Sequence, residues 1–155
     1  MQVTVVAIGQ RMPDWVARGF EEYRRRLSGQ VTMELIEVAA TRRGKNPDLK
    51  KIAEEEGRRL LSQIPVNALP IALEREGRTV DTLQLATLLQ SFIDDAQDIA
   101  IMIGGPEGLS SECLRAARHV LTLSKLTFAH PLVRIILAEQ IYRAHSINNG
   151  HPYHR

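Results

Sequence analysis

Cysteine is almost missing from this chain of 155 residues, because Cys113 is the only one. A single thiol excludes an intramolecular disulfide and a metal site built from several cysteines, and it fits a reducing compartment best. No apolar run approaches the roughly 20 residues of a membrane-spanning helix, and the start of the sequence has no basic signal-peptide region. We therefore expect a soluble cytoplasmic protein with no membrane partner.

The common phosphate-binding motifs are also lacking. Gly104, Gly105 and Gly108 follow an apolar run, but their spacing differs from G-x-G-x-x-G, and no Walker Lys-Ser/Thr pair follows. Glycine lets backbone N–H and C=O groups approach a flat or crowded ligand without a Cβ clash. Residues 104–108, called the glycine turn below, are either a ligand-binding turn or a tight turn alone, and their spacing leaves both readings open.

Positive charge is abundant at both ends of the chain, whereas residues 52–112 are acidic. Sixteen of the 20 cationic residues are arginine, the side chain suited to bidentate phosphate contacts. Few aromatic residues flank the basic clusters, and no helix-turn-helix or RRM signature is present, so base stacking and sequence readout are not indicated. Solvated helix surfaces would explain any single cluster, but the whole pattern predicts an anionic partner, with nucleic acid first.

Two basic clusters are the candidate RNA contacts. One is a run of three arginines, and the other is TRRGKN at residues 41–46, called the basic loop below. A glycine-containing basic loop at the mouth of a sheet is suited to contact phosphates. The candidate RNA-binding residues are Arg24, Arg25, Arg42, Arg43 and Lys45.

Strand-like and helical patterns alternate along the sequence. Runs of β-branched and apolar residues predict strands at 3–8, 33–38, 68–73, 99–103 and 120–123. Capping residues and helical periodicity predict helices at 14–27, 48–64, 82–96, 110–117 and 132–147. This alternation predicts one α/β domain with a mainly parallel sheet. Ligands bind beyond the carboxyl ends of such strands, so the connections at 73–77, 104–108 and 124–131 form one pocket if they converge.

The last predicted helix is apolar around most of its circumference and must be buried on two sides. In so small a chain, the second side is plausibly covered by another copy, which predicts a homodimer. Glu139 and Arg143 are spaced to form an ion pair on this helix or to line a site at the interface. The tail HPYHR is either incidental or functional. His151 and His154 have no carboxylate or cysteine partner nearby in the sequence, so we expect no metal.

Five segments together resemble one family, the RlmH family of SPOUT-class methyltransferases that act on 23S ribosomal RNA. They are MPDWVARGFEEY, TRRGKN, IGGPEGLS, SKLTFAHPLVRIILAEQIYRA and HPYHR, and the match runs in register over essentially the whole chain. The resemblance implies a single α/β SPOUT domain over residues 1–155. It places a deep trefoil knot at about 100–147 and a short functional tail at 148–155.

The resemblance also implies an activity. The chain would be a homodimer that uses S-adenosyl-L-methionine to methylate N3 of pseudouridine 1915 in helix 69 of 23S rRNA, within the assembled ribosome. Two alternatives stay open: the same fold acting as a non-catalytic ribosome- or RNA-binding factor, or the same chemistry on another RNA target. A hydrolase is disfavoured because the chain lacks a phosphate loop, a nucleophile elbow and metal-ligand clusters.

Residue by residue, the resemblance implies cofactor contacts at Leu73, Gly104, Gly105, Leu123, Ser124, Lys125, Leu126, Thr127 and Phe128. It implies that Tyr153, His154 and Arg155 reach the pocket of the partner subunit. Our hypothesis is that His154 removes or relays the N3 proton, Arg155 stabilises the developing anion and Tyr153 positions the base. Glu139 is the alternative base. Ala129 stands where many members of the family have proline.

Overall fold

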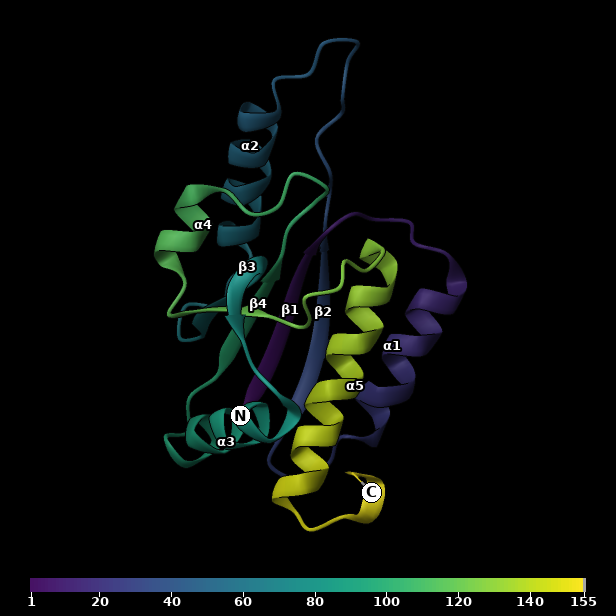
Figure 1. Ribbon diagram of the computed structural model, residues 1–155, viewed down its shortest axis with the longest axis vertical. Coiled ribbons are helices and arrows are strands. Elements are labelled where there is room, and N and C mark those ends of the chain that lie inside the picture. Colours follow the sequence, from purple (N-terminus) through teal and green to yellow (C-terminus); the bar gives the residue numbers. More distant parts are fainter. Residues whose placement is uncertain (155) are drawn as a thin grey trace.

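Five parallel strands form one sheet in the order β2-β1-β4-β3-β5 (Figure 1). The computed structural model describes residues 1–154, and side chains through residue 153. The strands are β1 (Gln2–Ile8), β2 (Thr32–Val38), β3 (Leu69–Thr79), β4 (Ile99–Ile103) and β5 (His119–Thr122). The helices are α1 (Asp14–Arg26), α2 (Leu49–Ser62), α3 (Thr82–Asp94), α4 (Ser111–Ala116) and α5 (His130–Asn148), followed by the short 3-10 helix η1 (Pro152–His154). The predicted α/β fold with a parallel sheet is confirmed.

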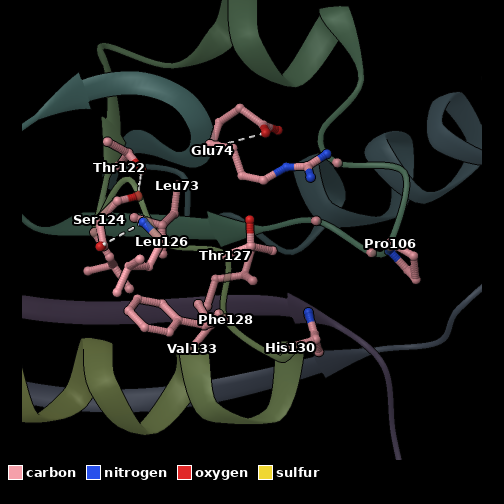
Figure 2. A pocket seen from close by; sticks show the side chains of 16 residues that line it. Leu73, Glu74, Pro106, Thr122, Ser124, Leu126, Thr127, Phe128, His130 and Val133 are labelled. Atoms are coloured by element: carbon pink, nitrogen blue, oxygen red, sulfur yellow. Dashed lines mark hydrogen bonds between the residues drawn. The ribbon is translucent and has the colours of Figure 1, made fainter.

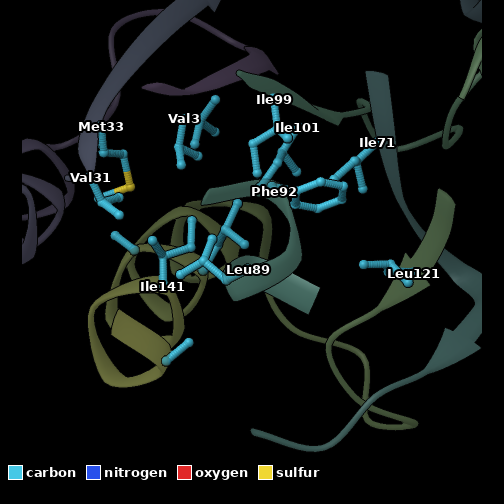
Figure 3. Close-up of a cluster of buried hydrophobic side chains, with 14 of the residues drawn as sticks. Val3, Val31, Met33, Ile71, Leu89, Phe92, Ile99, Ile101, Leu121 and Ile141 are labelled. Atoms are coloured by element: carbon cyan, nitrogen blue, oxygen red, sulfur yellow. The ribbon is translucent and has the colours of Figure 1, made fainter. Parts of the chain in front are cut away.

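The sheet is buried on both faces, as its apolar strands require. Successive side chains of a strand point to opposite faces, so Val3 and Val5 pack in the core with α1, α3 and α5. Val6 belongs to a second cluster with α2 and α4. Figure 3 shows the first cluster, in which Leu89 and Ile141 from two helices meet the sheet residues. The fold is therefore a three-layer arrangement with the sheet in the middle.

Strand β3 is longer than predicted, and this corrects the expected connection at 73–77. Leu73 and Arg78 both pair with Leu121 of β5, so the residues between them form a bulge inside the strand. A Cβ on Gly77 would lie 2.4 Å from the carbonyl carbon of Leu121, so the close approach of the two strands requires glycine there. The sequence EREG at 74–77 did not indicate a strand, because it lacks the alternation of apolar and polar residues that predicts one.

Helix α5 is covered on both flanks by the chain itself. It packs between α1 and α3: Ile135 lies against Gly19, and Asn148 donates a hydrogen bond to the Ala86 carbonyl at 2.9 Å. The sequence argument supposed that a second copy covers part of the apolar circumference of α5. Because α1 and α3 cover it, a second copy is not required. The homodimer stays a prediction that rests on the family resemblance, and the trefoil knot likewise stays a prediction.

The guanidinium of Arg134 joins the start of α5 to the ends of two strands. It is fully buried and pairs with Glu37 of β2 at 2.5 Å between Nη1 and Oε2. Its Nη2 donates to the carbonyls of Ile8 at 3.1 Å and Gly9 at 2.7 Å, beyond the end of β1. These bonds fix where α5 begins relative to the carboxyl edge of the sheet.

Replacing Arg134 with Ala should lower the free energy of unfolding by about 3 kcal/mol or more, because it leaves buried carbonyls without donors. Arg24→Ala is the matched control. That arginine pairs with Glu21 on an exposed helix surface, where an ion pair contributes little to stability. Urea unfolding of the two variants measures both values. Equal losses would contradict the role assigned to Arg134.

Candidate active site at the carboxyl edge of the sheet

A cavity of about 350 Å³ opens where the carboxyl ends of β3, β4 and β5 meet the start of α5 (Figure 2). Four chain segments line it: the β3 bulge, the end of β4 with the glycine turn, the segment after β5, and the first turn of α5. This is the size of a pocket for a small ligand and the location where parallel sheets bind them. The lining residues are Leu73, Glu74, Arg75, Ile103, Gly104, Gly105, Pro106, Gly108, Thr122, Leu123, Ser124, Leu126, Thr127, Phe128, His130 and Val133.

The structure brings eight of the nine candidate cofactor residues into the wall of this one cavity. Lys125 is the exception, because its side chain is exposed and is not part of the lining. Glu74, Arg75 and His130 lie within the connections that we expected to converge, although they were not among the candidate cofactor residues. Val133, inside α5, lies outside those connections, and no signal in the sequence indicated it.

Close backbone contact explains the glycine turn. A Cβ on Gly104 would lie 2.6 Å from the carbonyl carbon and oxygen of Gly108, and Gly108 itself has a φ of +78°. The N–H of Gly108 donates to the Gly105 carbonyl at 2.9 Å, which closes the turn. The glycines thus serve a tight turn, and that turn is also a wall of the cavity, so the two readings of the sequence are compatible.

The carboxylate of Glu74 ties the β3 bulge to the glycine turn. Oε2 accepts the backbone N–H of Leu109 at 3.0 Å, and Oε1 accepts that of Arg75 at 2.8 Å. Glu74 therefore joins two parts of the cavity wall and fixes its shape.

The segment after β5 is held by its own hydroxyl groups. Thr122 Oγ1 donates to the Ser124 carbonyl at 3.0 Å, and Ser124 Oγ accepts the N–H of Leu126 at 3.0 Å (Figure 2). Ala129 has φ −60° and ψ 136°, close to the φ that a proline ring imposes. Ala129 therefore has a proline-like conformation, at the position where the family resemblance led us to expect proline.

His130 is a neutral group in the wall of the cavity. Burial lowers the pKa of its imidazole, and the nearby charge of Arg134 lowers it further, while a hydrogen bond to the Ile8 backbone acts in the opposite direction. Its Nε2 lies 3.4 Å from Nη2 of Arg134. Because both contacts fix the ring, His130 orients the start of α5 and the cavity wall.

The tail residue Tyr153 folds back on α5 away from the cavity. Its hydroxyl lies 3.3 Å from Glu139 Oε1, and its ring stacks under the guanidinium of Arg143 and against Tyr142. Burial first, with Tyr23 and Glu139 nearby, raises the pKa of Tyr153 to about 12. Nine to 13 residues of α5 separate this cluster from His130, or roughly 14–20 Å along the helix. Arg155 and the side chain of His154 lie outside the described residues.

Glu139 and Arg143 form the ion pair that their spacing indicated, with Arg143 Nη2 2.8 Å from Glu139 Oε1. The pair holds Tyr153 and does not line the cavity of its own chain. Of the two readings left open by the sequence, the structural one describes this chain. An interface role would need the second subunit.

The two basic clusters differ in their ion pairs and in their position. Arg24 and Arg25 pair with glutamates on their own helix, α1, so part of their charge is already neutralised. Arg43 in the basic loop pairs with Glu107 in the glycine turn. Arg42 and Lys45 are exposed beside it. The basic loop is therefore attached to the rim of the cavity, whereas the α1 cluster is not.

The described part of the chain contains neither a metal-ligand cluster nor a membrane-spanning helix. No group of three or more His, Cys, Asp or Glu side chains within residues 1–153 is arranged to hold a metal ion. None of the helices described there is long and apolar enough to cross a membrane.

Gly104→Ala should destabilise the protein by about 1–3 kcal/mol, because the added Cβ meets backbone atoms that cannot move aside. Gly44→Ala in the basic loop is the control, since nothing lies within 4 Å of its Cβ position. Thermal and urea unfolding of both variants test this difference. A Gly104→Ala protein as stable as the parent would show that the turn is not tightly closed.

The chain matches known proteins over nearly its whole length. The family model described as "Predicted SPOUT methyltransferase" matches residues 1–154. A probable methyltransferase from Bordetella pertussis has a similar structure, with a TM-score of 0.60 at 18% identity, covering 92% of this chain and 95% of that one.

Two other solved structures are similar at lower scores. A probable rRNA-methyltransferase from Porphyromonas gingivalis has a TM-score of 0.51 at 16% identity, covering 95% of this chain and 69% of that one. A Legionella pneumophila protein solved with the bound cofactor SAM has a TM-score of 0.50 at 11% identity, covering 94% and 66%. At these identities the structures show the fold and do not by themselves show a function, but the family match spans almost every residue. The chain belongs to the SPOUT methyltransferase family.

Proposed function

We propose that this protein uses S-adenosyl-L-methionine to methylate N3 of the pseudouridine at position 1915, in helix 69 of 23S rRNA, in assembled ribosomes. The observation that carries the proposal is the cavity formed by the glycine turn, the segment 122–128 and the start of α5. Family membership supports methyl transfer. The similar Porphyromonas protein, named as an rRNA-methyltransferase, and the Legionella protein with bound SAM support the substrate class and the cofactor.

The residues of the cavity fit a ligand with a flat apolar part and several hydrogen-bonding groups. Leu73, Phe128 and Val133 are apolar walls, and Figure 2 shows their side chains close to the cavity. Gly104 and Gly105 present backbone groups without a Cβ between them and the ligand. When bound, S-adenosyl-L-methionine supplies a methyl group already activated by its sulfonium. The chain has mainly to align that methyl with N3, and such alignment can account for roughly 7–11 kcal/mol of a barrier.

The proton on N3 must also leave before the nitrogen lone pair can attack. A positioned general base contributes about 10²–10⁴-fold to such a step. Neither candidate base in the cavity wall is suited to this: Glu74 accepts two backbone N–H groups, and His130 is fixed between Ile8 and Arg134. The base is therefore brought by another segment, which we infer to be His154, with Arg155 stabilising the anion.

A second subunit would supply that segment. Tyr153 of the same chain lies on α5 roughly 14–20 Å from His130, so a tail in this position does not complete its own cavity. We infer a homodimer in which each tail reaches the cavity of its partner. The phenol of Tyr153, whose pKa is raised to about 12, is a hydrogen-bond donor near pH 7 and would position the base. Glu139, already within reach of this phenol, is the alternative base.

Recognition of the ribosome is assigned to the basic loop first. Arg43 contacts the glycine turn, and Arg42 and Lys45 are exposed in the same loop, where they could bind an RNA backbone that passes the mouth of the cavity. Arg24 and Arg25 are secondary contacts, because Glu21 and Glu22 compete with phosphates for them. Lys125, exposed beside the cavity, is better suited to contact an incoming nucleotide than a cofactor inside the cavity.

Transfer of labelled methyl from S-adenosyl-L-methionine tests the proposal on intact ribosomes, free large subunits and naked 23S RNA. We expect label on the helix 69 pseudouridine in intact ribosomes, and its loss with His154→Ala. Label at another nucleotide would move the activity to a different RNA target. Cofactor binding without label on any RNA, or no cofactor binding, would contradict the methyltransferase and favour a non-catalytic RNA-binding factor.

A further inference from the structure

The basic loop and the glycine turn are far apart in sequence, but two glutamates hold them together. We propose that Glu107 and Glu56 are positioning residues that make the phosphate-binding loop and the cavity wall one mechanical unit. Binding of an RNA phosphate at Arg43 then raises the affinity of the cavity for its cofactor, and cofactor binding raises the affinity for RNA. The inference rests on the proposed function and extends it to communication between the two ligands.

Glu107 connects the two segments at the rim of the cavity. Its carboxylate binds Nη2 of Arg43, across 64 positions of sequence. The Glu107 side chain is only 13% exposed, and that of Arg43 is 37% exposed, so the pair is partly shielded from water. A guanidinium has five N–H donors in a fixed plane. Since Glu107 engages one end of that plane, it orients Arg43 and leaves donors for a phosphate.

Glu56 connects the same segments from behind the cavity wall. This α2 residue is 2% exposed, and its Oε1 accepts the backbone N–H of Thr41 at 2.9 Å. Its Oε2 has no hydrogen-bond partner among the described residues, and a Cβ on Gly105 would lie 2.7 Å from it. One carboxylate thus holds the first residue of the basic loop and touches the centre of the glycine turn.

Helix α2 is the rigid support for both contacts. Arg59, one turn after Glu56, donates to the Ala39 carbonyl and to the Thr41 hydroxyl. Gly57 lies so close to Ser110 that a Cβ would be 2.2 Å from its hydroxyl oxygen. A displacement of residue 41 is therefore transmitted through α2 to the turn at 105, with little free space to absorb it.

Arg42 provides an internal contrast. It is exposed, and within residues 1–153 it has no ion pair, whereas its neighbour Arg43 is held by the glycine turn. Both would contribute a phosphate contact and a similar salt dependence. Only Arg43 would transmit the contact to the cavity. The effect must be reciprocal, because coupling between two binding sites is a single free energy.

Equilibrium dialysis with labelled S-adenosylhomocysteine, the demethylated cofactor, tests the coupling without turnover. Its Kd is measured with and without saturating ribosomes for the parent chain, Glu107→Gln, Glu56→Gln and Arg42→Gln. For the parent we expect ribosomes to tighten binding by about fivefold or more. Glu107→Gln should change the Kd measured without ribosomes by no more than about twofold. The ratio of the Kd without ribosomes to the Kd with ribosomes should fall to near one in this variant. Arg42→Gln should weaken ribosome binding and keep the coupling.

Glu107→Gln is the deciding variant, because its partly exposed side chain can be changed without exposing a buried charge, and urea unfolding verifies its stability. Glu56→Gln keeps the shape of the side chain and should reduce the coupling in the same direction. Full coupling in a folded Glu107→Gln protein would overturn the inference, as would a parent that binds both ligands independently. A parent that binds neither ligand contradicts the proposed function, and the inference with it.

Discussion

The buried guanidinium of Arg134 is the contact on which the geometry of the site depends. It lies at the start of α5 and bonds to the ends of β1 and β2, where the sheet presents its carboxyl edge. Its Nε has no hydrogen-bond partner among the described residues, so Nη1 and Nη2 make all the hydrogen bonds that hold the guanidinium there. His130, one turn earlier, is in contact with Arg134 and is a residue of the first turn of α5 that lies in the cavity wall. Arg134 thus links the helix whose first turn lines the cavity to the ends of β1 and β2.

Three glutamates lie in or beside the glycine turn. Their hydrogen bonds give them different roles. Glu74 accepts two backbone N–H groups and joins the β3 bulge to the glycine turn. Glu107 orients Arg43 at the rim, and Glu56 holds the basic loop from beneath. None of them needs to take part in the reaction, because each affects it by positioning other residues. Glu74 and Glu56 help to keep the backbone of residues 104–108 in place, whereas Glu107 extends from that turn to orient Arg43.

Much of the fold could be predicted from sequence, because local signals were strong. The β-branched runs and caps such as Asp81, whose carboxylate accepts the Gln84 N–H at 2.7 Å, indicated the right order of strands and helices. Eight of the nine candidate cofactor residues converge, because the carboxyl ends of parallel strands share one edge. The ligand that those residues bind is proposed from the family resemblance.

The rest depends on contacts between residues far apart in the chain. The β3 bulge exists only because β5 continues to pair beyond it, and the pairing of Arg43 with Glu107 spans 64 positions. No local pattern in RRGKN or in GGPEG indicates that one segment orients the other. The apolar circumference of α5 was correctly associated with burial on two sides, but α1 and α3 of the same chain provide both. Sequence periodicity shows that a surface is covered and does not show what covers it.

Subunit complementation tests the central claim, that a complete site needs the cavity of one chain and the tail of another. One variant would lack residues 152–155. The other would carry Thr127→Trp, which fills the cavity from an exposed lining position. Each alone should transfer no methyl group. After mixing and subunit exchange, about half of the dimers are mixed and each has one complete site, so about a quarter of the parent activity should return. A mixture that stays inactive, although exchange is demonstrated, would contradict a site shared between subunits.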